Sequence, residues 1–581
     1  MQPVVNRSSL LLTWALLLTI SYRSFGQASP LDFERVAPKR LPVTESRVTI
    51  PSPPERAVVA DETPVLARLD GIVLLDEPRQ VRRSSWPRLT GVKSEGSGLI
   101  SSPELAARLA PFLGKPANFG DLQVICTEIV RFYRDNNRPV VDAQLPEQEV
   151  TNGVLQILVI EGRMGRVIAE GQRWFPESRL IRGIRSRAGD SIEADRLLDD
   201  IHWLNRNPFR HSDLLFRKGT TIGETDLVIK TTDRFPFRPY VSYDNWGTDL
   251  TGNERWQTGF NWGDAFGLDQ ILSYQFSTAP DPKLFTAHAG TWTIPLPWRH
   301  VLDFYGSYSS SQPDTVDTDF DATSLQAGIL YTIPLPNFHG MKHEVSIGTD
   351  FKQSNNNLLF GGTNIFASDT DIVQLRASYQ LRELDTFGAT TAQAAVIYSP
   401  GGITSDNTDP AFEEQRAFAH ADYAYGRLTA QRTQKLPWNL TLVATASGQL
   451  ASGNLLASEQ FSLGGATTVR GYDETIANGD RGWLGSIELY SPPISLLSRI
   501  RTGAPEDELK LLAFFDAGGV SNIDLLPGED GYTGISGIGA GLRYRVNTWV
   551  SVRFDYAWSL QGIAGVDVDS SRGYISVSLS Y

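Results

Sequence analysis

The stretch VSVRFDYAW at residues 550–558 decides the fold class of this chain. Apolar residues occupy every second position, and polar or small residues occupy the positions between: Val550, Val552, Phe554, Tyr556 and Trp558 against Ser551, Arg553, Asp555 and Ala557. A period of two places these sets on opposite faces of a β-strand. One face is therefore apolar and aromatic, whereas the other carries full charges.

The same alternation continues through residues 236–581, for example over 538–546 and 575–581. Alternation by itself also fits a soluble β-sandwich, whose outer face is polar. Charges on the polar face and aromatic residues on the apolar face favour a membrane barrel, because a watery lumen accepts charges and aromatic side chains concentrate at bilayer interfaces. The charged residues on the polar face are Arg543, Arg545, Arg553 and Asp555, and the aromatic residues on the apolar face are Trp256, Trp262, Trp549 and Trp558. The length of the segment predicts an all-β transmembrane barrel of about 16 antiparallel strands.

Composition excludes several other classes of protein. The chain has 581 residues, and 53 Lys and Arg against 66 Asp and Glu give a formal net charge of −13, so it lacks the basic surface of a nucleic-acid-binding protein. Its one cysteine, Cys126, excludes internal disulfides and multi-cysteine metal sites. Beyond the N-terminal region, no apolar run approaches the roughly 20 residues that a membrane-spanning helix needs. Any crossing of a membrane then requires a closed barrel.

The N-terminal region predicts export. Arg7 precedes an apolar core over residues 10–20, and Ser24-Phe25-Gly26 supplies small residues for cleavage. We interpret residues 1–26 as a secretory signal peptide. Residues 27–63 are rich in Pro and charge and are interpreted as a linker. Their prolines argue against a long helix, and at most a short one fits around residues 31–36.

Two small α+β modules are predicted between the linker and the barrel, at residues 64–162 and 163–235. Each follows the order strand, helix, helix, strand, strand. In the first module, apolar residues at helical spacing continue from Asp121, and Cys126 in this helix is expected to pack in the core. In the second module, a helix ends before Asn207-Pro208-Phe209. Residues 77–97 resemble an insertion in the first module, with no assigned role.

Four short motifs give the chain a family resemblance. Two lie in the modules, Leu145-Pro146-Glu147-Gln148 with Asn152-Gly153, and Asn205-Arg206-Asn207-Pro208-Phe209. Two lie in the barrel segment, Val469-Arg470-Gly471-Tyr472 and Phe514-Phe515-Asp516-Ala517-Gly518. In this order they resemble the motifs of the two-partner-secretion translocators (TpsB, haemolysin secretion/activation ShlB type), in the superfamily that includes BamA. The resemblance implies that the modules are POTRA domains and that the VRGY motif lies in a loop folded into the barrel.

The resemblance also suggests what holds this loop. A guanidinium inside the lumen needs a carboxylate, because a desolvated charge is costly when it is unpaired. Asp516 alternates with Phe515, so its side chain faces the lumen, and a pair with Arg470 would fasten the loop to the wall. Gly471 and Gly518 would leave room for close backbone approach. From the residues alone, an ordinary surface ion pair worth about 0–1 kcal/mol is the simpler alternative.

The resemblance implies a transporter of the cell outer membrane. Its POTRA modules, in the periplasm, would capture the N-terminal secretion domain of an unfolded partner exoprotein of the adhesin or cytolysin type. Its barrel, monomeric in outer-membrane lipid, would export that partner. Two alternatives stay open: an assembly insertase of the same superfamily, and a passive porin, which leaves the modules unexplained.

No enzyme, cofactor or metal is expected. Gly114-Lys115 is followed by Pro116, where a phosphate-binding loop has Ser or Thr. His343-Glu344 has Ile347 where a zinc protease has its second histidine.

Overall fold

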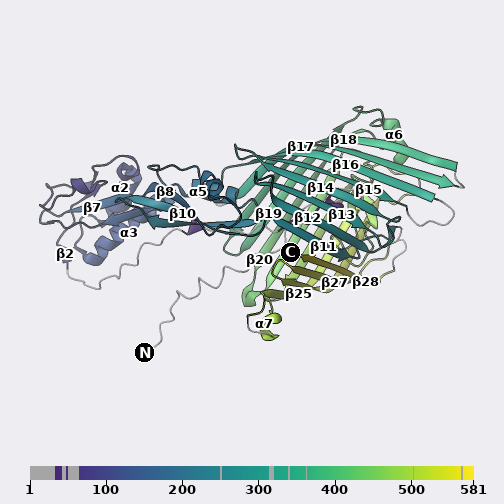
Figure 1. Cartoon of the computed structure of the whole chain (residues 1–581). Coiled ribbons are helices and arrows are strands. Elements are labelled where there is room, and N and C mark those ends of the chain that lie inside the picture. Colours follow the sequence, from purple (N-terminus) through teal and green to yellow (C-terminus); the bar gives the residue numbers. More distant parts are fainter. Residues whose placement is uncertain are drawn as a thin grey trace. The chain divides into compact units, whose positions relative to one another are not determined.

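The computed structural model describes residues 33–41, 48–49, 64–248, 251–312, 319–337, 341–360, 363–500, 503–563 and 567–581. They fall into two compact units (Figure 1). One unit lies within residues 43–234, and the other comprises residues 33–41 and those from Phe235 onward. The predicted signal peptide lies outside the described residues, as does the predicted linker apart from residues 33–41 and 48–49.

The second unit is a closed antiparallel barrel of 16 strands, which confirms the predicted fold class and strand number. Each strand pairs with the next, β21 pairs with β24 across a long loop, and β28 pairs with β11 to close the barrel. The strands are β11 (Phe237–Asp244), β12 (Arg255–Ala265), β13 (Gln270–Thr278), β14 (Thr286–Pro295), β15 (Val301–Ser311), β16 (Asp319–Pro334), β17 (Lys342–Phe360), β18 (Thr363–Asp385), β19 (Gly388–Pro400), β20 (Asp422–Lys435), β21 (Thr441–Ala451), β24 (Arg481–Tyr490), β25 (Asp507–Ser521), β26 (Tyr532–Val546), β27 (Val550–Ser559) and β28 (Ser571–Ser580).

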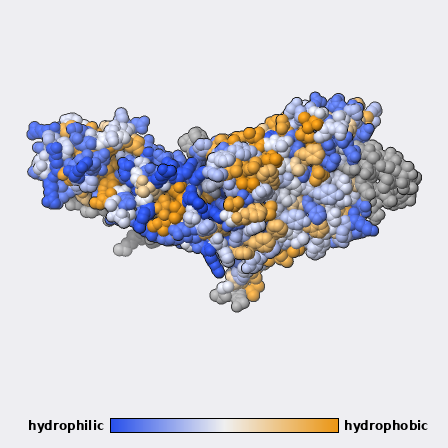
Figure 2. Space-filling model, turned by 45° about the horizontal axis from the view of Figure 1, so that its top comes forward, coloured by the Kyte–Doolittle hydropathy of each residue, from blue (hydrophilic) through white to orange (hydrophobic). Residues whose placement is uncertain are grey.

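The barrel wall separates apolar from polar side chains as the alternation predicts. On β27, Phe554, Tyr556 and Trp558 are exposed on the outer face, whereas Asp555 and Ala557 are fully buried inside. Figure 2 shows apolar residues gathered on the outer wall of the barrel. Among the helices that the structure describes, none combines the length and apolar character needed to cross a bilayer.

The first module of the other unit is a four-stranded sheet in the order β4-β3-β7-β6 with helices packed against it. Helix α3 begins with a capping box, in which the Asn118 side chain accepts the Asp121 N–H and the Asp121 carboxylate accepts the Asn118 N–H. Cys126 is buried in the apolar core, as expected. The elements are β2 (Pro64–Leu66), β3 (Gly71–Leu75), β4 (Gly91–Ser94), α2 (Pro103–Leu109), β5 (Ala117–Asn118), α3 (Phe119–Asp135), β6 (Val141–Gln144) and β7 (Val154–Glu161), with 3₁₀ turns η2 (Pro78–Gln80), η3 (Gly98–Ser101) and η4 (Ala110–Phe112).

Residues 77–97, interpreted as an insertion in the first module, stand between its strand β3 and its helix α2. They contain β4, which pairs in parallel with β3 from Gly71↔Gly91 to Leu74↔Ser94 and forms one edge of the sheet. A four-residue strand with a lysine and a serine has no apolar run, so its sequence does not indicate a strand.

The second module follows the predicted order strand, helix, helix, strand, strand. Its sheet has the order β1-β9-β10-β8, in which the short β1 adds in parallel to β9 through Val48↔Leu214 and Thr49↔Leu215. The elements are β1 (Val48–Thr49), β8 (Arg163–Glu170), α4 (Glu177–Arg182), α5 (Ala194–Leu204), β9 (Arg210–Lys218) and β10 (Glu224–Asp233).

Two further segments occupy the barrel lumen. One is a loop of residues 452–480 between β21 and β24, here called the inward loop, which contains the hairpin β22 (Phe461–Leu463) and β23 (Ala477–Gly479). The other is residues 33–41, where Phe33 packs on Tyr305 of β15 with ring centroids 5.1 Å apart. This segment begins with the one-turn helix α1 (Phe33–Val36), the only helix among the described linker residues, in line with the expected effect of the prolines. The loops of the barrel also hold α6 (Asp409–Gln415), η6 (Pro437–Asn439) and α7 (Leu497–Ile500).

Candidate functional site

The VRGY motif lies at the innermost part of the inward loop. Val469 and Tyr472 are buried together with apolar residues of the β22–β23 hairpin and of strands β24, β25 and β26. Arg470, between them, is only 2% exposed. A guanidinium at this depth must be paired, because an isolated buried charge is strongly unfavourable.

Arg470 is paired by two strands of the wall. Its Nε and Nη2 donate to the two carboxylate oxygens of Asp516 at 2.6 and 2.9 Å, a bidentate arrangement, and its main-chain N–H donates to the same carboxylate at 3.2 Å. Its Nη1 donates to Glu488 on β24 at 2.8 Å. The guanidinium also lies over the ring of Phe514, 3.4 Å from the centroid. The first phenylalanine and the aspartate of the F-x-D-x-G motif therefore both contact Arg470.

A wider group of charges surrounds this pair. Asp555 on β27 receives Arg543 Nη1 at 2.7 Å and Arg553 Nε at 2.8 Å, and it lies 3.7 Å from Arg470 Nη1. The group, here called the charge cluster, consists of Arg470, Arg543, Arg553, Glu488, Asp516 and Asp555. Three cations face three carboxylates, so the cluster is electrically balanced when the loop is docked.

The two motif glycines allow close approach between backbones. Gly471 has φ of +103°, and a Cβ there would lie 2.9 Å from the Ser559 main-chain nitrogen on β27. A Cβ at Gly518 would lie 2.8 Å from the carbonyl oxygen of Trp483. The Gly471 N–H donates to the Tyr574 hydroxyl at 2.9 Å, which fastens the loop to β28 as well.

A second charged contact lies at the end of the inward loop and is not marked by any sequence motif. Asp480 is fully buried, and Arg416, which follows α6 in the external loop 401–421, forms a bidentate pair with it. Asp480 also accepts the main-chain N–H groups of Leu455 at 2.8 Å and Ile523 at 3.0 Å. One carboxylate thus joins the external loop, the inward loop and the end of β25.

A third charged contact is Glu459, also in the inward loop and also missed from the sequence. Lys352 Nζ on β17 lies 2.7 Å from its carboxylate, and Gln374 and Tyr425 donate to it at 2.6 and 2.8 Å. The contact joins the inward loop to strands β17, β18 and β20. Inward-facing polar residues at alternating positions are the signal that could have suggested such partners, but alternation does not say which of them meet.

The POTRA-motif residues lie in turns of the modules and mainly hold those turns together. Gln148 exchanges two hydrogen bonds with the main chain of Gln156 on β7, at 2.6 and 2.7 Å. Asn205 does the same with Ser212, at 2.7 Å for both bonds. The other motif residues are Leu145, which packs against the first core, Pro146, Gly153 with φ of +72°, Asn207, which accepts the Phe209 N–H, Pro208 and the buried Phe209. Most of these side chains face the module itself, so capture of a partner needs other surfaces.

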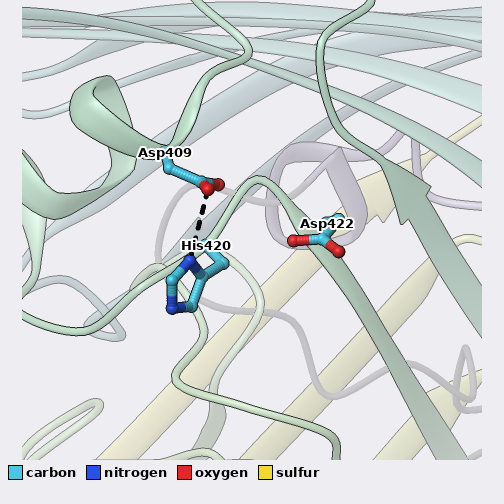
Figure 3. A group of neighbouring side chains, drawn as sticks. All are labelled: Asp409, His420 and Asp422. Carbon is cyan, nitrogen blue, oxygen red and sulfur yellow. Dashed lines mark ion pairs between the residues drawn. The ribbon is translucent and has the colours of Figure 1, made fainter.

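Figure 3 shows Asp409, His420 and Asp422, the described side chains that come closest to a metal-ligand arrangement. Their ligand atoms lie within 4.8 Å of one another. All three are exposed, His420 Nδ1 is 3.4 Å from Asp409, and the Ala421 N–H, with His420, lowers the pKa of the Asp409 carboxyl. These contacts are those of a charged turn, and we assign no metal to them.

Comparison with known proteins agrees with this geometry. A family model described as haemolysin secretion/activation protein ShlB/FhaC/HecB matches residues 223–544, and a ShlB-type POTRA domain model matches residues 88–162. The heme/hemopexin transporter protein HuxB of Haemophilus influenzae (strain 86-028NP) is 26% identical over 424 residues, 68% of this chain and 71% of that protein. The outer membrane transporter CdiB of Dickeya dadantii (strain 3937) is 23% identical over 518 residues, 85% of this chain and 86% of that protein. The solved structure of CdiB from Escherichia coli matches with a TM-score of 0.71 at 18% identity and covers 94% of each chain.

A closed 16-strand barrel with an inward loop in its lumen, preceded in the chain by α+β modules, is the fold that this chain shares with the solved CdiB structure. The family model covers more than half of the sequence. The chain belongs to the haemolysin secretion/activation protein family ShlB/FhaC/HecB. It is an outer-membrane translocator of the two-partner-secretion type with POTRA domains in the periplasm, and this membership supports export over barrel assembly.

Proposed function

We propose that the POTRA modules capture an unfolded exoprotein in the periplasm and that the barrel passes it to the cell surface. The partner is a large exoprotein of the adhesin or cytolysin type, recognised through its N-terminal secretion domain. The barrel works as a monomer and without catalytic chemistry or a cofactor. Family membership supports the transport direction, and the two steps below rest on the modules and on the lumen.

Capture uses free sheet edges. In the described part of the first module, β4 and β6 are the edge strands, and β8 is an edge of the second module's sheet. An edge strand offers unpaired main-chain groups to an extended peptide, so strand addition gives affinity with little demand on side-chain identity. This mode suits a partner that arrives unfolded.

The observation that carries the proposal is the polar lumen. Amide and hydroxyl side chains line the inside of the wall: Ser242, Gln257, Asn261, Ser273, Gln275, Ser277, Thr291, Ser324, Gln326, Thr332, Ser346 and Gln374. Such groups satisfy the N–H and C=O groups of an unfolded chain, which apolar side chains would leave unpaired. The inward loop and residues 33–41 occupy the lumen at rest, and export requires both to move.

We assign the control of that movement to the motif residues. Val469, Arg470, Gly471 and Tyr472 form the loop side of the docked contact, and Phe514, Asp516 and Gly518 form the wall side. The Arg470–Asp516 pair then acts as the fastening that is broken and remade during export.

Deletion of residues 64–162 tests the capture step. The full chain and the deletion variant are compared for binding to the isolated secretion domain of the exoprotein, in detergent. We expect binding to be lost, because the edges β4 and β6 are removed. Heat-modifiable migration on gels controls for barrel closure, and binding at unchanged affinity by a closed barrel would refute the docking scheme.

A further inference from the structure

Residues 33–41 lie inside the barrel and are fastened to its wall through main-chain atoms. The Phe33 N–H donates to the Gln326 side-chain oxygen at 2.9 Å, and the Val36 carbonyl accepts from the Gln275 amide at 3.0 Å. The Lys39 N–H donates to the Tyr240 hydroxyl at 2.9 Å, and the Lys39 carbonyl accepts from Arg238 at 3.3 Å. These four bonds recognise peptide groups and make no use of side-chain identity.

Two of the wall residues form a prearranged donor and acceptor. The Tyr240 hydroxyl donates to Gln275 Oε1 at 2.8 Å, which leaves its oxygen to accept a peptide N–H and the Gln275 amide nitrogen to donate to a carbonyl. Both residues lie in one cross-strand row, with Gly259 between them. A Cβ at Gly259 would lie 2.5 Å from the Tyr240 hydroxyl oxygen, so the glycine lets the tyrosine reach across β12.

We propose that Tyr240, Gln275 and Gln326, with Arg238, form a site for the main chain of a polypeptide in transit, here called the main-chain site. At rest, residues 33–41 of the chain itself occupy it. This inference rests on the proposed export function. An unfolded cargo varies in its side chains but presents the same N–H and C=O groups at every residue. A wall that pairs with these groups accepts any cargo sequence.

Three of the four bonds at this site join neutral groups, and the fourth, from Arg238 to the Lys39 carbonyl, is long at 3.3 Å, so the set suits passage. A hydrogen bond between neutral groups contributes little net free energy, since the peptide group exchanges it for a bond to water. Conduction through a pore requires binding strong enough for entry and weak enough for exit. The ion pair of Arg35 with Glu474, at 3.8 Å, joins the segment to the inward loop and not to the main-chain site.

Synthetic peptides test whether main-chain atoms are recognised. Current through the full-length protein in planar bilayers is recorded with three N-acetylated additives: the peptide FERVAPKRL of residues 33–41, a scrambled peptide of the same composition, and FERVAPKRL methylated on the amide nitrogens of Phe33 and Lys39. We expect the first two to shorten openings at concentrations within about threefold of each other, and the methylated peptide to need at least about tenfold more, because it lacks two of the N–H donors. A scrambled peptide that fails to block, or a methylated one that blocks as well as the first, overturns the proposal.

A wall variant tests the partners. In the Tyr240→Phe/Gln275→Leu protein, block by the unmodified peptide should weaken at least about tenfold. The matched control is Gln431→Leu, a lumen-facing glutamine on β20 whose amide donates to Thr445 at 3.1 Å, and it should change block less than about twofold. If the double variant fails to form a heat-modifiable barrel, Tyr240→Phe alone, which removes one oxygen, should weaken block about threefold. Unchanged block in a closed barrel overturns the proposal.

Export by the same variants separates transit from simple plugging. Loss of the bonds to residues 33–41 should raise the resting conductance, and loss of the main-chain site should lower the rate of exoprotein export about tenfold. Raised conductance with unchanged or faster export would mean that the wall holds only the protein's own segment, and the inference would be wrong. Absence of exoprotein export by the unmodified chain would instead refute the proposed function, while the peptide results would stand.

Discussion

Replacing Arg470 by alanine should release the inward loop while leaving the barrel assembled. The substitution removes the bidentate contact with Asp516, at 2.6 and 2.9 Å, the contact with Glu488 at 2.8 Å, and the stacking on Phe514. Asp516 keeps the Ser486 hydroxyl at 2.6 Å, and Glu488 keeps the Tyr490 hydroxyl at 2.9 Å. The strands pair through main-chain bonds, so closure of the barrel does not depend on Arg470.

The expected cost follows from burial. Removing one partner of a buried pair costs about 3–5 kcal/mol, because a carboxylate is left uncompensated. Once the loop moves, water enters the lumen and solvates the carboxylates. The substitution therefore raises the free energy of the docked state and not that of the released state. At about 1.4 kcal/mol per tenfold change, the ratio of docked to released loop falls roughly a hundred- to several-thousand-fold.

Loop release is measured by cysteine labelling. Cys126 is the chain's one cysteine, so Cys126→Ser with Thr468→Cys places a single thiol on the buried loop. In Arg470→Ala, an external maleimide should label position 468 about a hundredfold faster, and exoprotein export should fall sharply. The control is Arg545→Ala. Arg545 pairs with Glu508 at 2.9 Å, and their side chains are 34% and 23% exposed. An exposed pair of this kind is worth about 0–1 kcal/mol. Labelling and export indistinguishable from this control would refute the role assigned to Arg470.

Two further predictions concern other charged contacts. Arg416→Ala leaves the buried Asp480 without its cation. The external loop 401–421 should therefore become sensitive to protease added to intact cells. A loop that resists protease as well as in the unmodified chain would contradict this prediction. In the second module, the main-chain N–H and guanidinium of Arg166 lower the pKa of Asp226. Because the folded-state pKa is below the ordinary value of about 4, this stabilisation is present at neutral pH and is lost as pH falls through the lowered pKa. We therefore expect the protection of β8 and β10 against hydrogen exchange, corrected for intrinsic rates, to decrease less steeply with falling pH in Asp226→Asn than in the unmodified chain. An equally steep decrease in both proteins would show that the Arg166–Asp226 pair is not responsible.

The barrel could be predicted because lipid and water act on every residue of the wall. Phe515 and Asp516 are neighbours in sequence, yet Phe515 is exposed on the outer face and Asp516 is fully buried. Local alternation is therefore enough to assign the face of each side chain. The same alternation, taken alone, assigns the Asp516 side chain to the lumen.

The partners of these side chains could not be predicted in the same way. Arg470, Glu488, Asp516 and Asp555 come from a loop and three strands, and their meeting depends on the register between strands and on how far the loop descends. Local sequence pattern contains neither quantity. The motif resemblance supplied the Arg470–Asp516 pair, but it gave no indication of the pair between Arg416 and Asp480. The strand β4 was missed for a related reason, since parallel pairing with β3 stabilises a segment that has little strand propensity of its own.

The two segments in the lumen are held by different chemistry, and this difference orders the events of export. Charged pairs hold the inward loop. Because a buried charge without its partner is costly, we expect the loop to stay docked until the whole contact separates. Three of the four main-chain bonds that hold residues 33–41 join neutral groups, which exchange with water at little cost, and the bond from Arg238 is long at 3.3 Å, so this segment can leave bond by bond. An entering polypeptide can therefore replace residues 33–41 on the main-chain site before the loop moves. The contacts that the cargo makes there would then offset part of the free energy needed to separate Arg470 from Asp516.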